Sequence, residues 1–339
     1  MIYTGIQGAE FAPLPVFISS KNRIEKIQSS IKEFIVMNDA KKYIVSVLIL
    51  LVSGMFGGCI KEDYTDCPRP FRLTVKAWDA DMQDVTESGA VQRVVIFVFD
   101  ETGRRIDRLM MDAAEVAARK PIPLEYDGPT TVSFVAWANP DDRMLAETAD
   151  VQSIQDLFFR LASTNGIAQS PEDLFSGVLT CPIEYGSIEQ GADQTVDIYR
   201  RTAQVHIIIR GYQDWLDANG PRVLPDYADI LLGETPDTYT GLAELIGNAV
   251  QYRPDGQIEN GDFISSIFRV YPTLDTTPLH LKLYAYGEEL LNFSAGSDGV
   301  PFIPVVGKML NIYIDLRGAN LSVIVSVTPW DVVQQYAEY

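Results

Sequence analysis

The sequence predicts an all-β fold, arranged as two β-sandwich domains in tandem. Three observations support this: runs of alternating apolar and polar residues dominate residues 71–339, turn-forming residues separate them, and helical periodicity is confined to one or two short segments. Short strands with turns between them favour sandwiches over a parallel sheet alternating with helices. A domain usually holds roughly 100 to 200 residues, so this part of the chain is long enough for two.

The N-terminal segment has the pattern of a bacterial signal peptide. Residues 43–56 are almost wholly apolar and follow Lys41 and Lys42. A membrane-spanning helix needs about 20 apolar residues, so this shorter run fits the core of a signal peptide better; a buried helix is the alternative. Since such peptides open with their charged region, we expect translation to start at Met37.

That start divides the N-terminus into two segments. Residues 37–58 are then the signal peptide, and residues 1–36 are a mis-assigned upstream extension. A real cytoplasmic extension is the alternative for residues 1–36.

A cysteine follows the apolar run at the position where lipoproteins are acylated. Two small residues precede it in Gly57-Gly58-Cys59, as in a lipobox. We therefore expect cleavage between Gly58 and Cys59 and attachment of fatty acids such as palmitate to Cys59. Several acyl chains on one residue give a stable membrane anchor, and residues 59–70 become a lipidated tether.

The tether carries a short charged motif. Lys61, Glu62 and Asp63 resemble the Lys-acid-acid signal that sends some bacterial lipoproteins to the outer face of the outer membrane. An ordinary polar tether is the alternative.

Six runs are the main predicted strands. Strict alternation predicts strands with one buried face at residues 71–78 and 309–316, and runs rich in β-branched residues predict central strands elsewhere. These central candidates are Val91–Phe99, Thr130–Ala138, Val205–Ile209 and Leu321–Val327. Gly, Pro, Asn and Asp mark the turns between them.

Helical patterns are few. Apolar residues at helical spacing predict one helix at Ala146–Ala162, and Asp112–Lys120 is a candidate for a shorter one. Both fall in the first predicted domain, residues 71–198. The second domain, residues 199–339, is expected to begin after a seam near residues 191–202.

The two remaining cysteines suggest a disulfide. With Cys59 acylated, Cys67 and Cys181 form one pair in a chain bound for an oxidising compartment. Two separate buried thiols are the alternative. The cysteines lack the paired spacing of a zinc site, and no cofactor or metal is expected.

Composition and motifs argue against nucleic-acid binding and catalysis. The formal net charge of −19 repels phosphate backbones. Both histidines, His206 and His280, lie in alternating runs, and nucleophile-elbow, phosphate-loop and zinc-protease motifs are missing from the sequence. Asp79, Asp81 and Asp84 could bind Ca²⁺, but a solvated acidic turn is the better interpretation. We expect no catalytic residues.

One candidate function for a chain with these features is a surface lipoprotein that binds a glycan or host protein. Trp215 is the candidate contact because it lies in the turn-like segment Gly211–Gly220. Trp78 and Trp137 lie within predicted strands and are expected in the core.

The order of features resembles the type V fimbrilin superfamily and, within it, the lipoprotein anchors and minor subunits. The resemblance covers almost the whole chain beyond the signal peptide, and its motifs are individually weak but occur in a characteristic order. They are Cys59 with Cys67-Pro68, Val94–Asp100 followed by Gly103, Phe134–Asn139, Asp173–Gly177, Val196–Val205, and Ile314–Leu316 with Leu321–Val323 and Trp330.

The resemblance implies two transthyretin-like sandwiches and a role as a fimbrial anchor or accessory subunit. Its partners would be fimbrial shaft or accessory subunits, joined by β-strand complementation, and the outer membrane, joined through the lipid. Polymerising members lose an N-terminal strand by proteolysis. An anchor must stay joined to its lipid, so residues 71–78 are expected to be retained.

Overall fold

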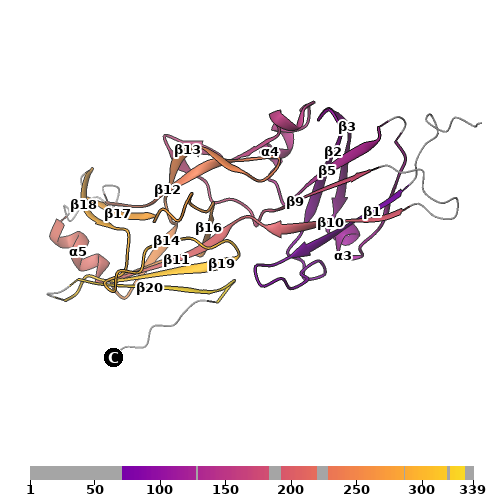
Figure 1. The fold of residues 1–339 in the computed structure, drawn as a ribbon. Coiled ribbons are helices and arrows are strands. Elements are labelled where there is room, and N and C mark those ends of the chain that lie inside the picture. Colours follow the sequence, from indigo (N-terminus) through magenta and orange to yellow (C-terminus); the bar gives the residue numbers. More distant parts are fainter. Residues whose placement is uncertain are drawn as a thin grey trace, which may run out of the picture. The chain divides into compact units, whose positions relative to one another are not determined.

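The computed structural model describes residues 71–126, 129–182, 192–219, 228–285, 287–318 and 321–332 (Figure 1). The chain divides into two compact units, residues 1–64 and 65–339, and every described residue lies in the second. Most of these residues are in strands, so the predicted all-β class is confirmed. Within these ranges, no helix has the length and apolar character needed to cross a bilayer.

The first sheet has seven strands in the order β3-β2-β5-β9-β10-β1-β4. They are β1 (Phe71–Trp78), β2 (Arg93–Asp100), β3 (Arg105–Asp112), β4 (Ile122–Leu124), β5 (Thr131–Ala138), β9 (Phe175–Pro182) and β10 (Ala192–Arg200). Strand β1 runs parallel to β10 over eight residue pairs and antiparallel to β4.

This sheet folds over on itself into two layers. Buried residues of β1 share one apolar core with those of β2 and β5, although β1 is distant from both in the strand order. The rings of Phe71 in β1 and Phe134 in β5 meet edge to face, with centroids 5.5 Å apart. The layers join where β9 and β10 pair through only two residue pairs. The first sheet is therefore a sandwich, as predicted.

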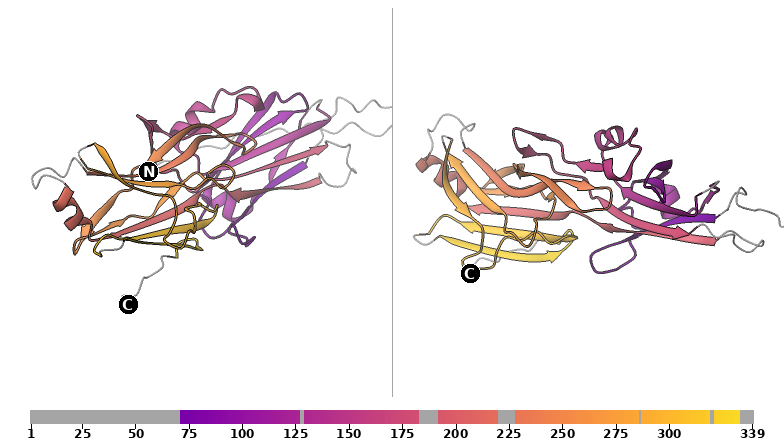
Figure 2. Two further views of the ribbon diagram at one scale, coloured as in Figure 1. Left: turned by 60° about the vertical axis from the view of Figure 1, so that its left-hand side comes forward. Right: turned by 45° about the horizontal axis from the view of Figure 1, so that its top comes forward.

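Two further sheets form the second sandwich. The second sheet has the order β14-β15-β11-β19-β20, with β16 beside β11. The third sheet has the order β18-β17-β12-β13-β8-β7, with β6 beside β12. The right view of Figure 2 shows the orange strands of the latter over the yellow strands of the former.

The bounds of these strands follow the same chain order. They are β6 (Phe158–Arg160), β7 (Ser163–Thr164), β8 (Ile167–Ala168), β11 (Ala203–Arg210), β12 (Ala228–Thr240), β13 (Leu245–Tyr252), β14 (Gly256–Glu259), β15 (Asp262–Ser265), β16 (Phe268–Val270), β17 (His280–Ala285), β18 (Glu288–Phe293), β19 (Lys308–Asp315) and β20 (Ser322–Pro329).

The apolar core of the second sandwich continues onto the outer face of β2 and β5. Trp137 of β5 stacks on Phe159 of β6 with ring centroids 4.1 Å apart. Its indole N–H donates to the backbone oxygen of Gly241 over 3.0 Å. The first sheet and the β6–β12 region therefore share buried surface.

All six predicted strands occur. For two of them, the predicted position in the sheet or the predicted burial is wrong. Residues 321–327, predicted as a central strand, belong to β20, which lies at the edge of its sheet. Residues 309–316, predicted with one buried face, belong to β19, which is buried on both faces. Asn311 fits there because its amide nitrogen donates to the Thr328 hydroxyl.

The predicted helix at residues 146–162 is wrong. This stretch holds the end of α4 (Asp142–Glu147), the 3₁₀ turn η1 (Ile154–Asp156) and strand β6. Leu157, Phe159 and Leu161 are buried at alternate positions. Their period of two, together with pairing to β12, outweighs the helical spacing.

The shorter helix is confirmed as α3 (Ala113–Ala117), and its start follows from a capping box. Asp112 accepts a hydrogen bond from the Glu115 backbone N–H, while Glu115 accepts one from Asp112 N–H. A third helix, α5 (Tyr212–Asn219), was missed because this stretch was predicted as a turn.

Residues 158–168 do not follow the predicted domain boundary at residue 198. They were assigned to the first domain, yet β6, β7 and β8 belong to the third sheet. The chain otherwise passes from the first sheet to the second between Arg200 and Ala203. The division into independently folding domains stays a prediction.

Candidate functional site

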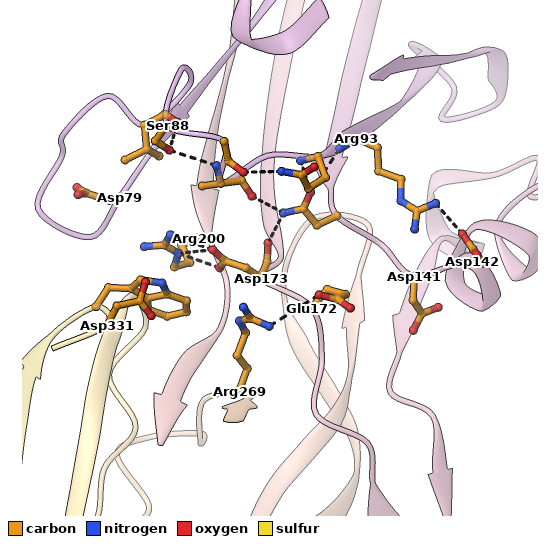
Figure 3. A pocket seen from close by; sticks show the side chains of 16 residues that line it. Asp79, Ser88, Arg93, Asp141, Asp142, Glu172, Asp173, Arg200, Arg269 and Asp331 are labelled. Atoms are coloured by element: carbon orange, nitrogen blue, oxygen red, sulfur yellow. Dashed lines mark hydrogen bonds and ion pairs between the residues drawn. The ribbon is translucent and has the colours of Figure 1, made fainter. Parts of the chain in front are cut away.

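A buried ion pair lies where the chain passes from the first sheet to the second. Arg200 ends β10, and its Nε donates to Asp173 Oδ1 over 2.8 Å while Nη2 donates to Oδ2 over 2.9 Å (Figure 3). Burial raises the pKa of Asp173, and the Arg200 guanidinium offsets part of that effect. Two parallel hydrogen bonds fix the arginine in one orientation.

Aromatic rings flank the same guanidinium. Its central carbon lies 3.9 Å from the ring centroid of Trp330, just after β20, and 4.9 Å from that of Phe175 in β9. Cation–π contacts of this kind contribute on the order of 0.5–2 kcal/mol each. Arg200 thereby connects β9, β10 and the end of the last described strand.

Asn139 organises the neighbouring loops. Its Nδ2 donates to the backbone oxygens of Ala90 and Asp173 over 2.7 and 2.8 Å, and its Oδ1 accepts from the Gln92 N–H. The residue has a positive φ of 57°, which asparagine tolerates better than most side chains. The loop that carries Asp173 is therefore tied to the start of β2.

A cavity of about 890 Å³ opens beside this ion pair. Six carboxylate and three arginine side chains line it: Asp79, Asp141, Asp142, Glu172, Asp173 and Asp331, with Arg93, Arg200 and Arg269 (Figure 3). Many of these groups bond to residues of this chain, as in the pairing of Arg93 with Asp142 and the mutual hydrogen bonds of Gln204 and Asp331. These bonds join separate segments of the chain.

Acidic residues of this region bond to other groups of the chain. In the described ranges, no cluster of three or more His, Cys, Asp and Glu side chains could hold a metal. Asp79 accepts two backbone N–H groups within its own turn, Asp81 pairs with Lys308, and Asp84 binds Thr86 and Arg119. These bonds favour the acidic-turn interpretation of Asp79, Asp81 and Asp84 over Ca²⁺ binding.

Both histidines lie on strands. His206 is buried in β11, and burial lowers its pKa. His280 bonds to Asn292 on the neighbouring strand β18. Neither histidine has a carboxylate hydrogen-bond partner among the described residues.

Strand β1 completes the first sandwich. It occupies a full strand position between β10 and β4, and it buries Phe71, Leu73, Val75 and Ala77 in the core of the first sandwich. The outer side chains also pair, since Arg72 forms a salt bridge with Asp193. The groove that a missing first strand would leave is therefore filled by the chain's own residues.

Most predicted site residues lie outside the described ranges. These are Gly58 and Cys59 at the cleavage and acylation site, Lys61, Glu62 and Asp63 of the export motif, and Cys67 of the predicted disulfide. Cys181, on β9, is a buried free thiol whose pKa is raised by burial. Its pairing with Cys67 stays a prediction.

Trp215 does not occupy the predicted turn. It lies on α5, is partly buried against the core and stacks on Tyr212 with ring centroids 5.7 Å apart. Trp137 is fully buried as predicted, whereas Trp78 is only partly buried, with Lys76 over its ring and a hydrogen bond to Asp197.

The buried Arg200–Asp173 pair was not identified from the sequence, although both residues fall in motifs of the resemblance. The available signal was two consecutive arginines, Arg200 and Arg201, at the end of a strand in an acidic chain.

Comparisons with known proteins agree with this architecture. A family model for fimbrillin-A associated anchor proteins Mfa1 and Mfa2 matches residues 64–336. The chain is 91% identical over 303 residues to the major fimbrium anchoring subunit FimB of Porphyromonas gingivalis, which covers 89% of this chain and 100% of that protein. The matches indicate structural fimbrial subunits and no enzyme family.

Solved structures share the fold at low identity. The fimbrial anchor protein Mfa2 from P. gingivalis aligns with a TM-score of 0.55 and 13% identity, covering 78% of this chain and 98% of Mfa2. An adhesin candidate from Bacteroides ovatus aligns with a TM-score of 0.57 and 13% identity, covering 79% and 95%. By the family match and the close relative together, the chain belongs to the fimbrillin-A associated anchor proteins.

Proposed function

We propose that this protein attaches a fimbria to the outer membrane, held there by fatty acids on Cys59. Its family and its 91% identical relative support the anchoring role. The apolar run, the small residues before Cys59 and the Lys61-Glu62-Asp63 motif support lipid attachment and display on the outer face. The 303 residues aligned with that relative equal the length of residues 37–339, which supports the start at Met37.

One structural observation carries the proposal: β1 is in place. The strand begins at Phe71, 12 residues after Cys59, and runs between β10 and β4. A subunit that keeps this strand keeps the covalent path from its lipid to its folded body. A pull on the lipid would load β1 along its length, where eight residue pairs with β10 share the force.

Strand complementation is the proposed joining mode. A strand added to a sheet edge gains main-chain hydrogen bonds for affinity and alternating side-chain contacts for specificity. Because β1 fills the position beside β10, the incoming strand would use a different edge. Fimbrial shaft or accessory subunits are the proposed partners.

The Cys59→Ser variant tests the anchoring role. Without a thiol to acylate, the variant should leave the membrane fraction, and fimbriae should move from the cells into the medium. Cell-bound and released fimbriae are measured by immunoblotting. Cys181→Ser serves as the control because Cys181 lies within the folded body. Fimbriae that stay on cells carrying Cys59→Ser would contradict the proposal.

A further inference from the structure

The outer edge of β20 has no strand beside it among the described residues. In the second sheet β20 follows β19 and ends the strand order, and Figure 1 shows it along that border. Strand β19 pairs with β20 over eight residues, so β20 is firmly held on one side. An unpaired strand edge presents a row of N–H and C=O groups that another strand can bind.

Hydrogen bonds at one residue show which backbone groups face outward. The Val323 N–H donates to the Ser297 hydroxyl over 2.8 Å, and the Val323 oxygen accepts from the Ser297 N–H over 2.7 Å. Val323 therefore points its backbone groups away from β19. Since these groups alternate along a strand, those of Val325 and Val327 point the same way. No described residue bonds to them there.

Among the described strands, this edge differs in length and charge from the other five that end a sheet. Strands β4, β7 and β14 have only two to four residues. The longer edges carry charge, with four charged residues in β3 and two glutamates in β18. Strand β20 has eight residues, Ser-Val-Ile-Val-Ser-Val-Thr-Pro, and none is charged. Natural sheets protect long exposed edges with charges, bulges or coverage. The turn at Gly296 and Ser297 covers part of β20, beside Val323 and the Val325 side chain, while Val327 stays 49% exposed.

Apolar side chains are also exposed along this edge. Ile324 and Val327 are 44% and 49% exposed, and Leu321 and Val332 flank them at 45% and 47%. Ile324 and Val327 point to opposite faces of the sheet, so the edge is uncharged and apolar on both faces. In a chain with net charge −19, such an edge suits a partner segment that is itself uncharged. Burying an unpaired charge against it would cost free energy.

We propose that β20 is the docking edge of this protein and that it takes an extended, uncharged segment of a fimbrial subunit. The segment adds to the second sheet beside β20, where it bonds the outward groups of Val325 and Val327 and covers the exposed Ile324 and Val327. Pro329 ends the row because proline has no N–H to offer. This inference rests on the proposed anchoring function and names the surface that would perform it.

Two variants of the lipidated full-length protein test the edge by cosedimentation with purified fimbriae. Val327→Lys places a charge on the edge, and Val325→Pro removes an N–H that β19 does not use. Each should weaken binding by about tenfold or more. Met110→Lys is the matched control, because Met110 is 52% exposed on the edge strand β3, which already carries charge. It should bind like the wild type, and the thermal midpoints of Val327→Lys and Met110→Lys should match that of the wild type.

The outcomes distinguish a failure of the docking edge from a failure of the proposed anchoring function. Wild-type protein that does not sediment with fimbriae contradicts the proposed function and removes the partner named here. Undiminished binding of Val327→Lys overturns the docking edge and leaves the function standing. If wild-type protein instead dimerises through this edge, and Val327→Lys abolishes the dimer without affecting fimbriae, the edge binds a second copy and the proposed occupant is wrong.

Discussion

At the residue scale, the Arg200–Asp173 pair connects segments of the two sandwiches, in addition to the apolar core that they share. One guanidinium bonds a carboxylate from the loop before β9 and stacks against Trp330 beyond β20. Burial raises the Asp173 pKa above its ordinary value of 3.8. This carboxyl's own contribution to stability is therefore greatest below that pH and falls as the pH rises through the folded-state pKa.

Replacing Asp173 by Asn should destabilise the protein by about 3 kcal/mol, because the buried Arg200 charge loses its partner. Chemical denaturation measures the change. The matched control is Asp142→Asn, which removes the salt bridge with Arg93 at a carboxylate side chain that is 90% exposed. That control should cost less than about 1 kcal/mol. Equal losses in the two variants would show that the buried pair has no special role.

Sequence reasoning worked for residues whose chemistry is local and failed for those that depend on tertiary contacts. The lipidation prediction at Cys59 depends only on a short motif, and it stays a prediction because Cys59 lies outside the described ranges. Arg200 and Asp173 are 27 residues apart, and only the fold brings them together. Trp215 was predicted to lie in a turn because the residues around it are polar. It lies on a helix instead, and its ring packs on that of Tyr212.

At the element scale, Gly177 allows β9 and β10 to approach where the first sheet folds over. A Cβ at this position would lie 1.9 Å from the backbone oxygen of Asp197. Backbone cannot yield as a flexible side chain can, so the strands would have to separate.

Gly177→Ala should therefore lower the free energy of unfolding by about 2–4 kcal/mol. Thermal and chemical denaturation measure the loss. Val178→Ala is the control, because the adjacent Val178 side chain is 44% exposed and its truncation should change stability little. An alanine variant at residue 177 with wild-type stability would contradict the close approach of β9 and β10.

Strand periodicity could be predicted from sequence, but sheet position could not. The β-branched run at residues 321–327 was expected to be central because such runs usually fill sheet interiors. In β20 the same composition lies at an edge. The mismatch between an apolar strand and an open edge is the observation behind the docking proposal.

At the scale of the whole molecule, sequence patterns predicted the two sandwiches but not how the chain divides between them. The tandem order of strands predicted a boundary at residue 198, yet β6–β8 cross into the third sheet. That segment places Phe159 against Trp137 of the first sheet. A core shared in this way forms by packing between segments that are distant in the sequence. The periodicity of apolar residues within one segment does not predict such packing.

The account's central claim is that a lipid on Cys59 stays covalently joined, through β1, to the body that holds the fimbria. Mass spectrometry of the native protein from outer membranes tests this most directly. We predict a mature chain that begins at Cys59, carries fatty acid and retains residues 71–78. A mature chain that begins after Trp78, or one that begins upstream of Cys59 without fatty acid, would contradict the claim.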